Sequence, residues 1–296
     1  MVRCYMDVSS GKQGLIRSKP KKLDLSDCTL VDMHFHSKYS YDSRSTIAKI
    51  LSRAKKLRVG VAITDHNQIQ GSLVALSQKD TLVVPGVELK SKEGVHILAY
   101  PYSKGDLIEL EKKCIIPFMD KSLSLSISVI DLLEKLKGIN CLVGAAHPYF
   151  SYVGIQTARL EKNFMKSLDC VEVLNASSLK KMNNKAYRWA LEEGKGLIGG
   201  SDGHRVMDLA KTVTGAEGKV SVEEFLESIR KRQSFVIGRE SNLLSKTFEA
   251  VSKEAYILTS PKGMKVVHGN LKLAFGHYKY KLKDWVENRK KMKSRV

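Results

Sequence analysis

Histidine is concentrated in a few short segments that also carry acidic residues. Six of the eight histidines lie in five such segments. They are Asp32-Met33-His34-Phe35-His36, Thr64-Asp65-His66, Gly94-Val95-His96, Ala146-His147-Pro148 and Ser201-Asp202-Gly203-His204. Between the second and the third, Glu88 follows an apolar run. Imidazole and carboxylate groups bind zinc, manganese or iron, so the sequence predicts a metal site with more ligands than one ion needs.

Two of these segments place their metal-binding side chains two residues apart. His34 and His36 are separated by one residue, as are Asp202 and His204. Residues at positions i and i+2 of a strand point to the same face. Each pair can therefore chelate one ion from the end of a strand.

Apolar runs alternate with helical patterns from about Leu30 onward, which indicates an α/β fold with parallel strands. The expected strands cover 30–36, 59–65, 81–88, 94–100, 139–146, 169–174 and 196–201, and the expected helices cover 45–57, 122–137, 156–167, 181–193 and 221–231. Most of the polar segments end or directly follow an apolar run. Because α/β folds bind ligands at the carboxyl ends of their strands, we expect the segments to converge on one face.

Length and composition indicate one main domain with two extensions. The 296 residues suit an α/β unit of about 250 residues. We expect an N-terminal extension over 1–28, a barrel over 29–240 and a basic, helical C-terminal extension over 241–296. Tyr278, Leu282 and Trp285 recur at helical spacing within that last segment.

The chain carries a formal net charge of +19. Such a charge attracts phosphates and nucleic acid, although surface lysines that only aid solubility give the same count. The five cysteines contain no Cys-x-x-Cys pair, which favours a reducing cytoplasm. No signal-like segment or run of 18 apolar residues occurs, so we expect a cytoplasmic protein without a membrane partner.

Taken in order, the motifs resemble the PHP (polymerase and histidinol phosphatase) superfamily of metal-dependent phosphoesterases. The resemblance covers about residues 30–240. It rests on the segments that begin at Asp32, Ser40-Tyr41-Asp42, Thr64-Asp65-His66, Pro85-Gly86-Val87-Glu88, His96, Ala146-His147-Pro148 and Gly200-Ser201-Asp202-Gly203-His204. The segment 169–175, followed by a helix and 199–204, also resembles the one that closes the barrel in many stand-alone members. This favours a free-standing enzyme over a polymerase appendage.

The resemblance implies a distorted (β/α)7 barrel with two or three divalent metals, zinc, manganese or iron, at its mouth. His34, His36, Glu88 and Asp202 would hold the first metal. Glu88 would bridge to a second metal on His96 and His147, and Asp42, His66 and His204 would hold a third. Asp65, beside His66, can orient an imidazole or a water molecule, since a ligand histidine usually donates its other N–H to an acceptor; it can equally be a strand-end or turn residue. The candidate catalytic residues are Asp65, His66 and His204.

One loop departs from the family pattern. Many relatives have Ser-Asp-Gly where this chain has Tyr41-Asp42-Ser43 followed by Arg44. Arg44 and Arg205 are candidate phosphate clamps, since guanidinium groups bind phosphate in a bidentate way. Either residue can equally be a surface charge.

The function expected from these features is hydrolysis of a phosphate ester, in a nucleotide or a short nucleic acid, by metal-activated water. An amidohydrolase-type barrel is an alternative, because it also opens with His-x-His. A basic nucleic-acid-binding protein with an inactive barrel is a second alternative.

Overall fold

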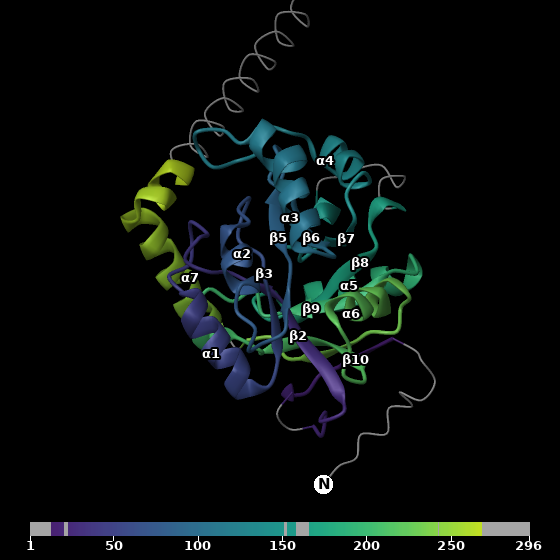
Figure 1. Cartoon of the computed structure of the whole chain (residues 1–296). Coiled ribbons are helices and arrows are strands. Elements are labelled where there is room, and N and C mark those ends of the chain that lie inside the picture. Colours follow the sequence, from purple (N-terminus) through teal and green to yellow (C-terminus); the bar gives the residue numbers. More distant parts are fainter. Residues whose placement is uncertain (1–12, 21–22, 151–152, 158–165, 242, 268–296) are drawn as a thin grey trace, which may run out of the picture.

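The computed structural model describes residues 13–20, 23–150, 153–157, 166–241 and 243–267, and its strands form two sheets (Figure 1). The first sheet runs in the order β1 (Gly14–Ile16), β11 (Phe235–Gly238), β10 (Thr212–Glu217), β2 (Cys28–Phe35), β3 (Gly60–Ile63) and β4 (Val83–Val84). The second runs β5 (Val87–Lys90), β6 (His96–Pro101), β7 (Cys141–Ala145), β8 (Cys170–Asn175) and β9 (Gly196–Gly200).

Backbone hydrogen bonds join the two sheets at two places. Beyond β3, His66 forms a parallel bridge with Glu88 of β5. Beyond β9, Gly203 forms a parallel bridge with Phe35 of β2, and the Asp202 N–H donates to the His34 carbonyl at 2.8 Å. Pairing therefore continues from β2 and β3 through the second sheet and back to β2. Each junction includes a residue of a histidine-containing segment.

Helices cover the outside of the sheets. They are α1 (Ile47–Leu57), α2 (Gln70–Leu76), α3 (Lys104–Leu110), α4 (Val129–Leu136), α5 (Lys180–Glu192), α6 (Val222–Arg230) and α7 (Leu243–Thr259). Shorter helical turns are η3 (Glu111–Ile115), η4 (Ile116–Phe118), η5 (Ile155–Thr157) and η7 (Val206–Asp208). The expected α/β class is confirmed.

Local sequence explains where these helices begin and end. In α1 the buried side chains are Ile47, Ile50, Leu51 and Ala54, the spacing of one helical face. The helix ends at Arg58, which adopts a left-handed conformation and returns its N–H to the last turn. In α6 the Ser221 side chain and Glu224 form a reciprocal capping box.

The expectation that all strands run parallel is wrong. β6 is antiparallel to both β5 and β7, and β10 is antiparallel to β2 and β11. The cause for β6 is the short turn between Lys90 and His96, because a parallel crossover needs a dozen or more residues. His96 begins this reversed strand and pairs with Lys90 at the end of β5. It therefore still lies at the edge where the parallel strands end.

Several expected element boundaries also change. The run 81–88 splits into β4 and β5 around Pro85-Gly86, since proline lacks a ladder donor. The expected helix 122–137 begins only at Val129, after the Ser128 cap. Residues 158–165 of the expected helix 156–167 lie outside the described residues, and so does the segment with Tyr278 and Trp285. Strand β1 lies within the expected N-terminal extension and pairs with β11.

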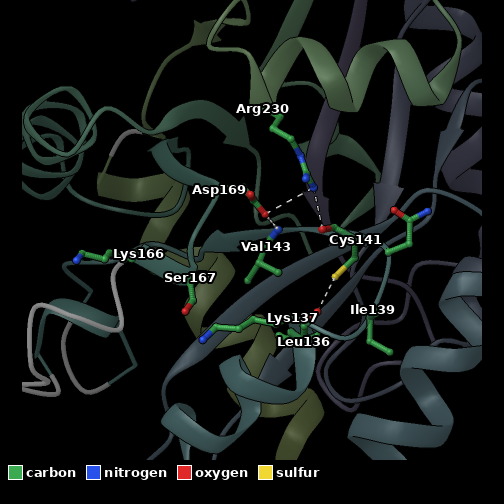
Figure 2. A pocket seen from close by; sticks show the side chains of 10 residues that line it. Leu136, Lys137, Ile139, Cys141, Val143, Lys166, Ser167, Asp169 and Arg230 are labelled. Carbon is green, nitrogen blue, oxygen red and sulfur yellow. Dashed lines mark hydrogen bonds and ion pairs between the residues drawn. The ribbon is translucent and has the colours of Figure 1, made fainter.

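A surface pocket lies at the end of the second sheet remote from the histidines (Figure 2). Its lining includes Cys141 at the start of β7 and Asp169 just before β8. Figure 2 shows Arg230 beside Asp169, whose carboxylate accepts the Val143 N–H at 2.8 Å. These contacts hold together the amino-terminal ends of β7 and β8. The polar residues of the pocket therefore have a structural role. Within the described residues, no helix is both long and apolar enough to cross a bilayer.

Candidate metal centre

All nine residues expected to bind metal lie together at one edge of the sheets. Each is buried except Asp202, which is partly exposed. Their positions follow from the strands: His34 lies in β2, Glu88 in β5 and His96 at the start of β6. The others lie in the segments that come after β2, β3, β7 and β9, namely His36, Asp42, His66, His147, Asp202 and His204.

Glu88 occupies the centre of this cluster. Its Oε1 atom lies 2.8 Å from His96 Nδ1 and 3.1 Å from His147 Nε2. Its Oε2 atom lies 2.9 Å from His66 Nδ1, 3.4 Å from His34 Nε2 and 3.5 Å from His36 Nε2. One fully buried carboxylate thus faces five imidazoles, the arrangement expected of a group that bridges two metals.

The possible ligand atoms form overlapping groups in which all atoms lie within 4.8 Å of one another. The groups are His34, His36 and Glu88; His34, His147 and Asp202; His66, Glu88 and His96; and His36, Asp42, His66 and His204. Asp42, His66 and His204, here called the Asp42 subsite, share the last group as the resemblance implied. His147 lies with both Glu88 and Asp202, so it can serve either of two neighbouring ions.

Glu172 is a functional candidate that the sequence reasoning left without a role. It is buried within β8, and its Oε1 lies 3.0 Å from His34 Nδ1. Its other oxygen accepts the His147 N–H at 2.7 Å and the Asn175 side-chain amide at 3.0 Å. A metal-binding histidine usually donates its second nitrogen to such an acceptor. The signal in the sequence was a single glutamate within the apolar strand Cys170–Asn175.

The residues present fit a divalent cation. His34 Nε2 and His36 Nε2 lie only 3.2 Å apart, while Glu172 occupies the other nitrogen of His34. Glu88 Oε2 and His66 Nδ1 lie 2.9 Å apart, and among the described residues neither buried atom has a hydrogen-bond partner. The donor set is imidazole and carboxylate without thiolate, which suits zinc, manganese or iron. A cation between His34 Nε2 and His36 Nε2 would bind the lone pairs of these two nitrogens, which otherwise repel each other.

The ionisation of the cluster also favours a cation. Burial alone would lower the pKa of His34, but the carboxylates of Glu172, Glu88 and Asp202 outweigh it and raise that pKa well above its usual value. Burial lowers the pKa of His36 to about 3 and that of His96 to about 3. The carboxylates therefore attract positive charge, while two imidazoles keep neutral nitrogens that can bind metal.

Two buried aspartates hold the loops that carry the ligands. Asp65 accepts the Ser37 N–H at 2.6 Å and the Ser37 hydroxyl at 2.7 Å, so it fixes the loop between His36 and Asp42. Asp32 accepts the Ser201 N–H at 2.8 Å and its hydroxyl at 2.6 Å, beside Asp202. Burial raises the pKa of each aspartate to about 6, although these hydrogen bonds oppose the rise. These contacts support a positioning role for Asp65.

Backbone strain is found at two of the candidate ligands. His147 has φ of 25° and Asp202 has φ of 47°, a region that residues other than glycine rarely adopt. Such conformations cost about 1–3 kcal/mol each and tend to occur at functional sites. Here they turn the side chains toward Glu88 and His36 directly after β7 and β9.

The family profile matches residues 32–291, and its description is PHP domain. The chain belongs to the PHP domain family. No curated protein is similar enough in sequence to match this PHP domain protein. Its fold is similar to that of solved structures at low sequence identity.

Three such structures share the fold of this PHP domain. A two-domain protein from Bacteroides vulgatus, which contains a PHP-like metal-dependent phosphoesterase, has a TM-score of 0.55 and 16% identity, over 75% of this chain and 69% of its own. PsfC from Pseudomonas syringae has a TM-score of 0.57 and 17% identity, over 78% and 98%. The lesion-specific endonuclease Q from Pyrococcus furiosus has a TM-score of 0.58 and 17% identity, over 69% and 56%.

The two candidate phosphate clamps of this PHP domain both contact side chains of helix α7. The Arg44 guanidinium stacks 4.6 Å from the ring centre of Tyr256. Arg205 donates two hydrogen bonds to Asp208, at 2.8 and 2.9 Å, and lies 5.3 Å from the ring centre of Phe248. Arg205 is thus already paired with a carboxylate, whereas Arg44 is exposed. Their roles as clamps stay predictions.

The close packing of Gly200 against His34 gives a testable prediction. A Cβ atom on Gly200 would lie 2.3 Å from the His34 Cβ and 2.6 Å from its backbone nitrogen. We expect Gly200→Ala to destabilise the fold by about 1–3 kcal/mol through overpacking and to move His34. Thermal unfolding measures this effect. Gly138→Ala is the control, because its Cβ would meet nothing closer than 3.6 Å, and equal melting temperatures would contradict the prediction.

Proposed function

We propose that the protein is a metal-dependent phosphoesterase that hydrolyses a phosphate ester in a nucleotide or short nucleic acid. The observation that carries the proposal is the convergence of six histidines and three carboxylates on one buried edge, with Glu88 at the centre. Membership of the PHP domain family supports metal-dependent hydrolysis. The proposal extends this to a phosphate ester as the substrate.

The residues divide into groups that can hold ions and groups that position them. We assign His34, His36, Glu88 and Asp202 to one ion, and Glu88, His96 and His147 to a second. The Asp42 subsite is a candidate third position. Ions about 3.5–4 Å apart would activate water and stabilise the entering and leaving oxygens of a phosphoryl group. Glu172 would fix the His34 ring, and Asp65 would fix the loop that carries Asp42.

The charge of the chain and one structural neighbour support a nucleic-acid or nucleotide substrate. A net charge of +19 favours encounter with polyanions. A second endonuclease Q structure, with a TM-score of 0.57 and 17% identity, holds a DNA duplex with an abasic lesion at its active site. This chain spans only 57% of that protein. The DNA substrate of endonuclease Q is therefore support by analogy.

Replacing His34 and His36 together with alanine tests the proposed activity. The double variant removes two buried ligands, so we expect hydrolysis to fall more than about 100-fold, beyond the range for outer-shell changes. The assay screens phosphomonoesters, cyclic nucleotides, nucleoside bisphosphates and short oligonucleotides with manganese or zinc. Glu223→Ala, on the exposed side of α6, is the control.

The same screen separates the alternative functions. Full activity in the double variant would contradict the proposal. Turnover of an amide or lactam without any phosphate ester would favour the amidohydrolase alternative. Steeply salt-dependent binding of RNA or DNA without metal-stimulated turnover would favour a binding protein with an inactive barrel.

A further inference from the structure

Helix α7 brings a lysine into the Asp42 subsite. Lys253 Nζ lies 2.8 Å from Asp42 Oδ2 and 3.0 Å from His204 Nε2. The Asp42 side chain is fully buried, whereas 31% of the Lys253 side chain is exposed. The lysine thus reaches from the surface of the molecule to a buried carboxylate.

Contacts along α7 hold the helix across the mouth of the centre. Lys246 donates to the Ser178 carbonyl, in the loop after β8. Phe248 packs against Arg205 after β9, and Tyr256 packs against Arg44 after β2. Beyond the helix, Lys262 donates to the Tyr39 carbonyl at 3.2 Å. These contacts reach three loops, and two of them, after β2 and after β9, carry candidate ligands. The position of Lys253 is therefore set by the whole helix.

The Lys253 ammonium binds the same atoms that a third metal would use. Within the subsite, Asp42 Oδ2 lies 2.9 Å from His204 Nε2 and 3.2 Å from His66 Nε2. A divalent ion requires these atoms at about 2.0–2.2 Å. An ammonium group only about 3 Å from two of them would overlap such an ion, and two cations this close repel strongly at a buried site. The subsite therefore accommodates one or the other.

We infer that Lys253 supplies the positive charge of the Asp42 subsite in place of a third divalent ion. The centre then holds two ions, bridged by Glu88, together with one ammonium group from α7. The inference rests on the proposed metal centre and adds a limit on its stoichiometry. It also assigns α7 to the site, although the sequence placed that segment in a C-terminal extension.

Metal content measured on the full chain tests the inference. We expect wild-type protein, equilibrated with manganese and freed of excess metal, to retain two ions per chain. Lys253→Met removes the ammonium and keeps the length of the side chain, so it should retain three. Lys265→Met, at an exposed position, is the control and should retain two. Anomalous diffraction from manganese-soaked crystals of Lys253→Met should then show the added ion between Asp42, His66 and His204.

Other results would overturn either the role of Lys253 or the metal centre itself, and the two cases can be distinguished. Three ions in wild-type protein, or two in a folded Lys253→Met variant, would exclude substitution of a metal by the lysine. If Lys253→Met fails to fold, Lys253→Gln provides the same comparison, with folding checked by thermal unfolding. Loss of metal from every variant and from wild type would instead overturn the proposed metal centre itself.

Discussion

Replacing Glu88 with glutamine is expected to lower kcat/KM by more than about 100-fold, beyond the range for outer-shell changes. The substitution keeps the size of the side chain but removes the charge that faces five imidazoles. An amide also cannot bridge two cations as a carboxylate does. Metal content should therefore fall together with activity. The measurement combines steady-state hydrolysis of the best substrate with elemental analysis of the same sample.

The position of Glu88 makes this variant informative. The histidines around it hold the cluster at the junction of β3 and β5, where His66 and Glu88 pair through their backbones. Backbone pairing does not depend on the side chain, so the variant should fold. Glu223→Gln, which changes an exposed glutamate, controls for the loss of one negative charge. Wild-type activity and metal content in Glu88→Gln would contradict a bridging role.

Replacing Glu172 with glutamine is expected to weaken metal binding by about 10–100-fold, the usual range for a group that orients a ligand. Glu172 lies 3.0 Å from the Nδ1 atom of His34, whereas the Nε2 atom of that ring faces Glu88 and His36. The amide would keep the shape of the side chain but lose the charge that favours a proton on Nδ1. A competition titration against a metal-sensitive dye measures the change.

The alanine variant at this position separates metal binding from folding. Glu172→Ala would leave the His147 N–H and the Asn175 amide without their acceptor. Breaking a buried ion pair of this kind costs about 3–5 kcal/mol, so the metal-free variant should melt well below wild type. Glu192→Gln, at an exposed position of α5, is the control. Unchanged metal affinity in Glu172→Gln would remove its role in orienting His34.

Much of the metal centre could be predicted because ligand chemistry leaves a strong local pattern. His34 lies near the end of β2 and His36 directly after it, two residues apart, and Asp202 with His204 repeats that spacing after β9. Apolar runs before these segments identify the strands without any knowledge of their neighbours. Since strand ends gather at one edge, the local pattern was enough to predict that the side chains converge.

Other features depend on contacts between distant segments, and the sequence predicted them less well. The reversal of β6 follows from the short turn at Gly94, whose positive φ of 85° marks a tight connection. The short turn is visible in the sequence, but the general alternation of strands and helices favoured a parallel arrangement for this strand too. Lys253 carries no local signal at all, because a lysine on a helix is ordinary. Only the packing of α7 across three loops brings it to Asp42.

The measurement that most directly tests the central claim is hydrolysis of the best phosphate ester from the screen by chelated protein as manganese is titrated back. The account predicts no turnover without metal, and a rise in rate that saturates as the Glu88 centre fills. Glu88→Gln, measured in parallel, should stay inactive at every concentration. Full activity in the chelated protein, or an equal rise in Glu88→Gln, would contradict the claim that these residues form a hydrolytic metal centre.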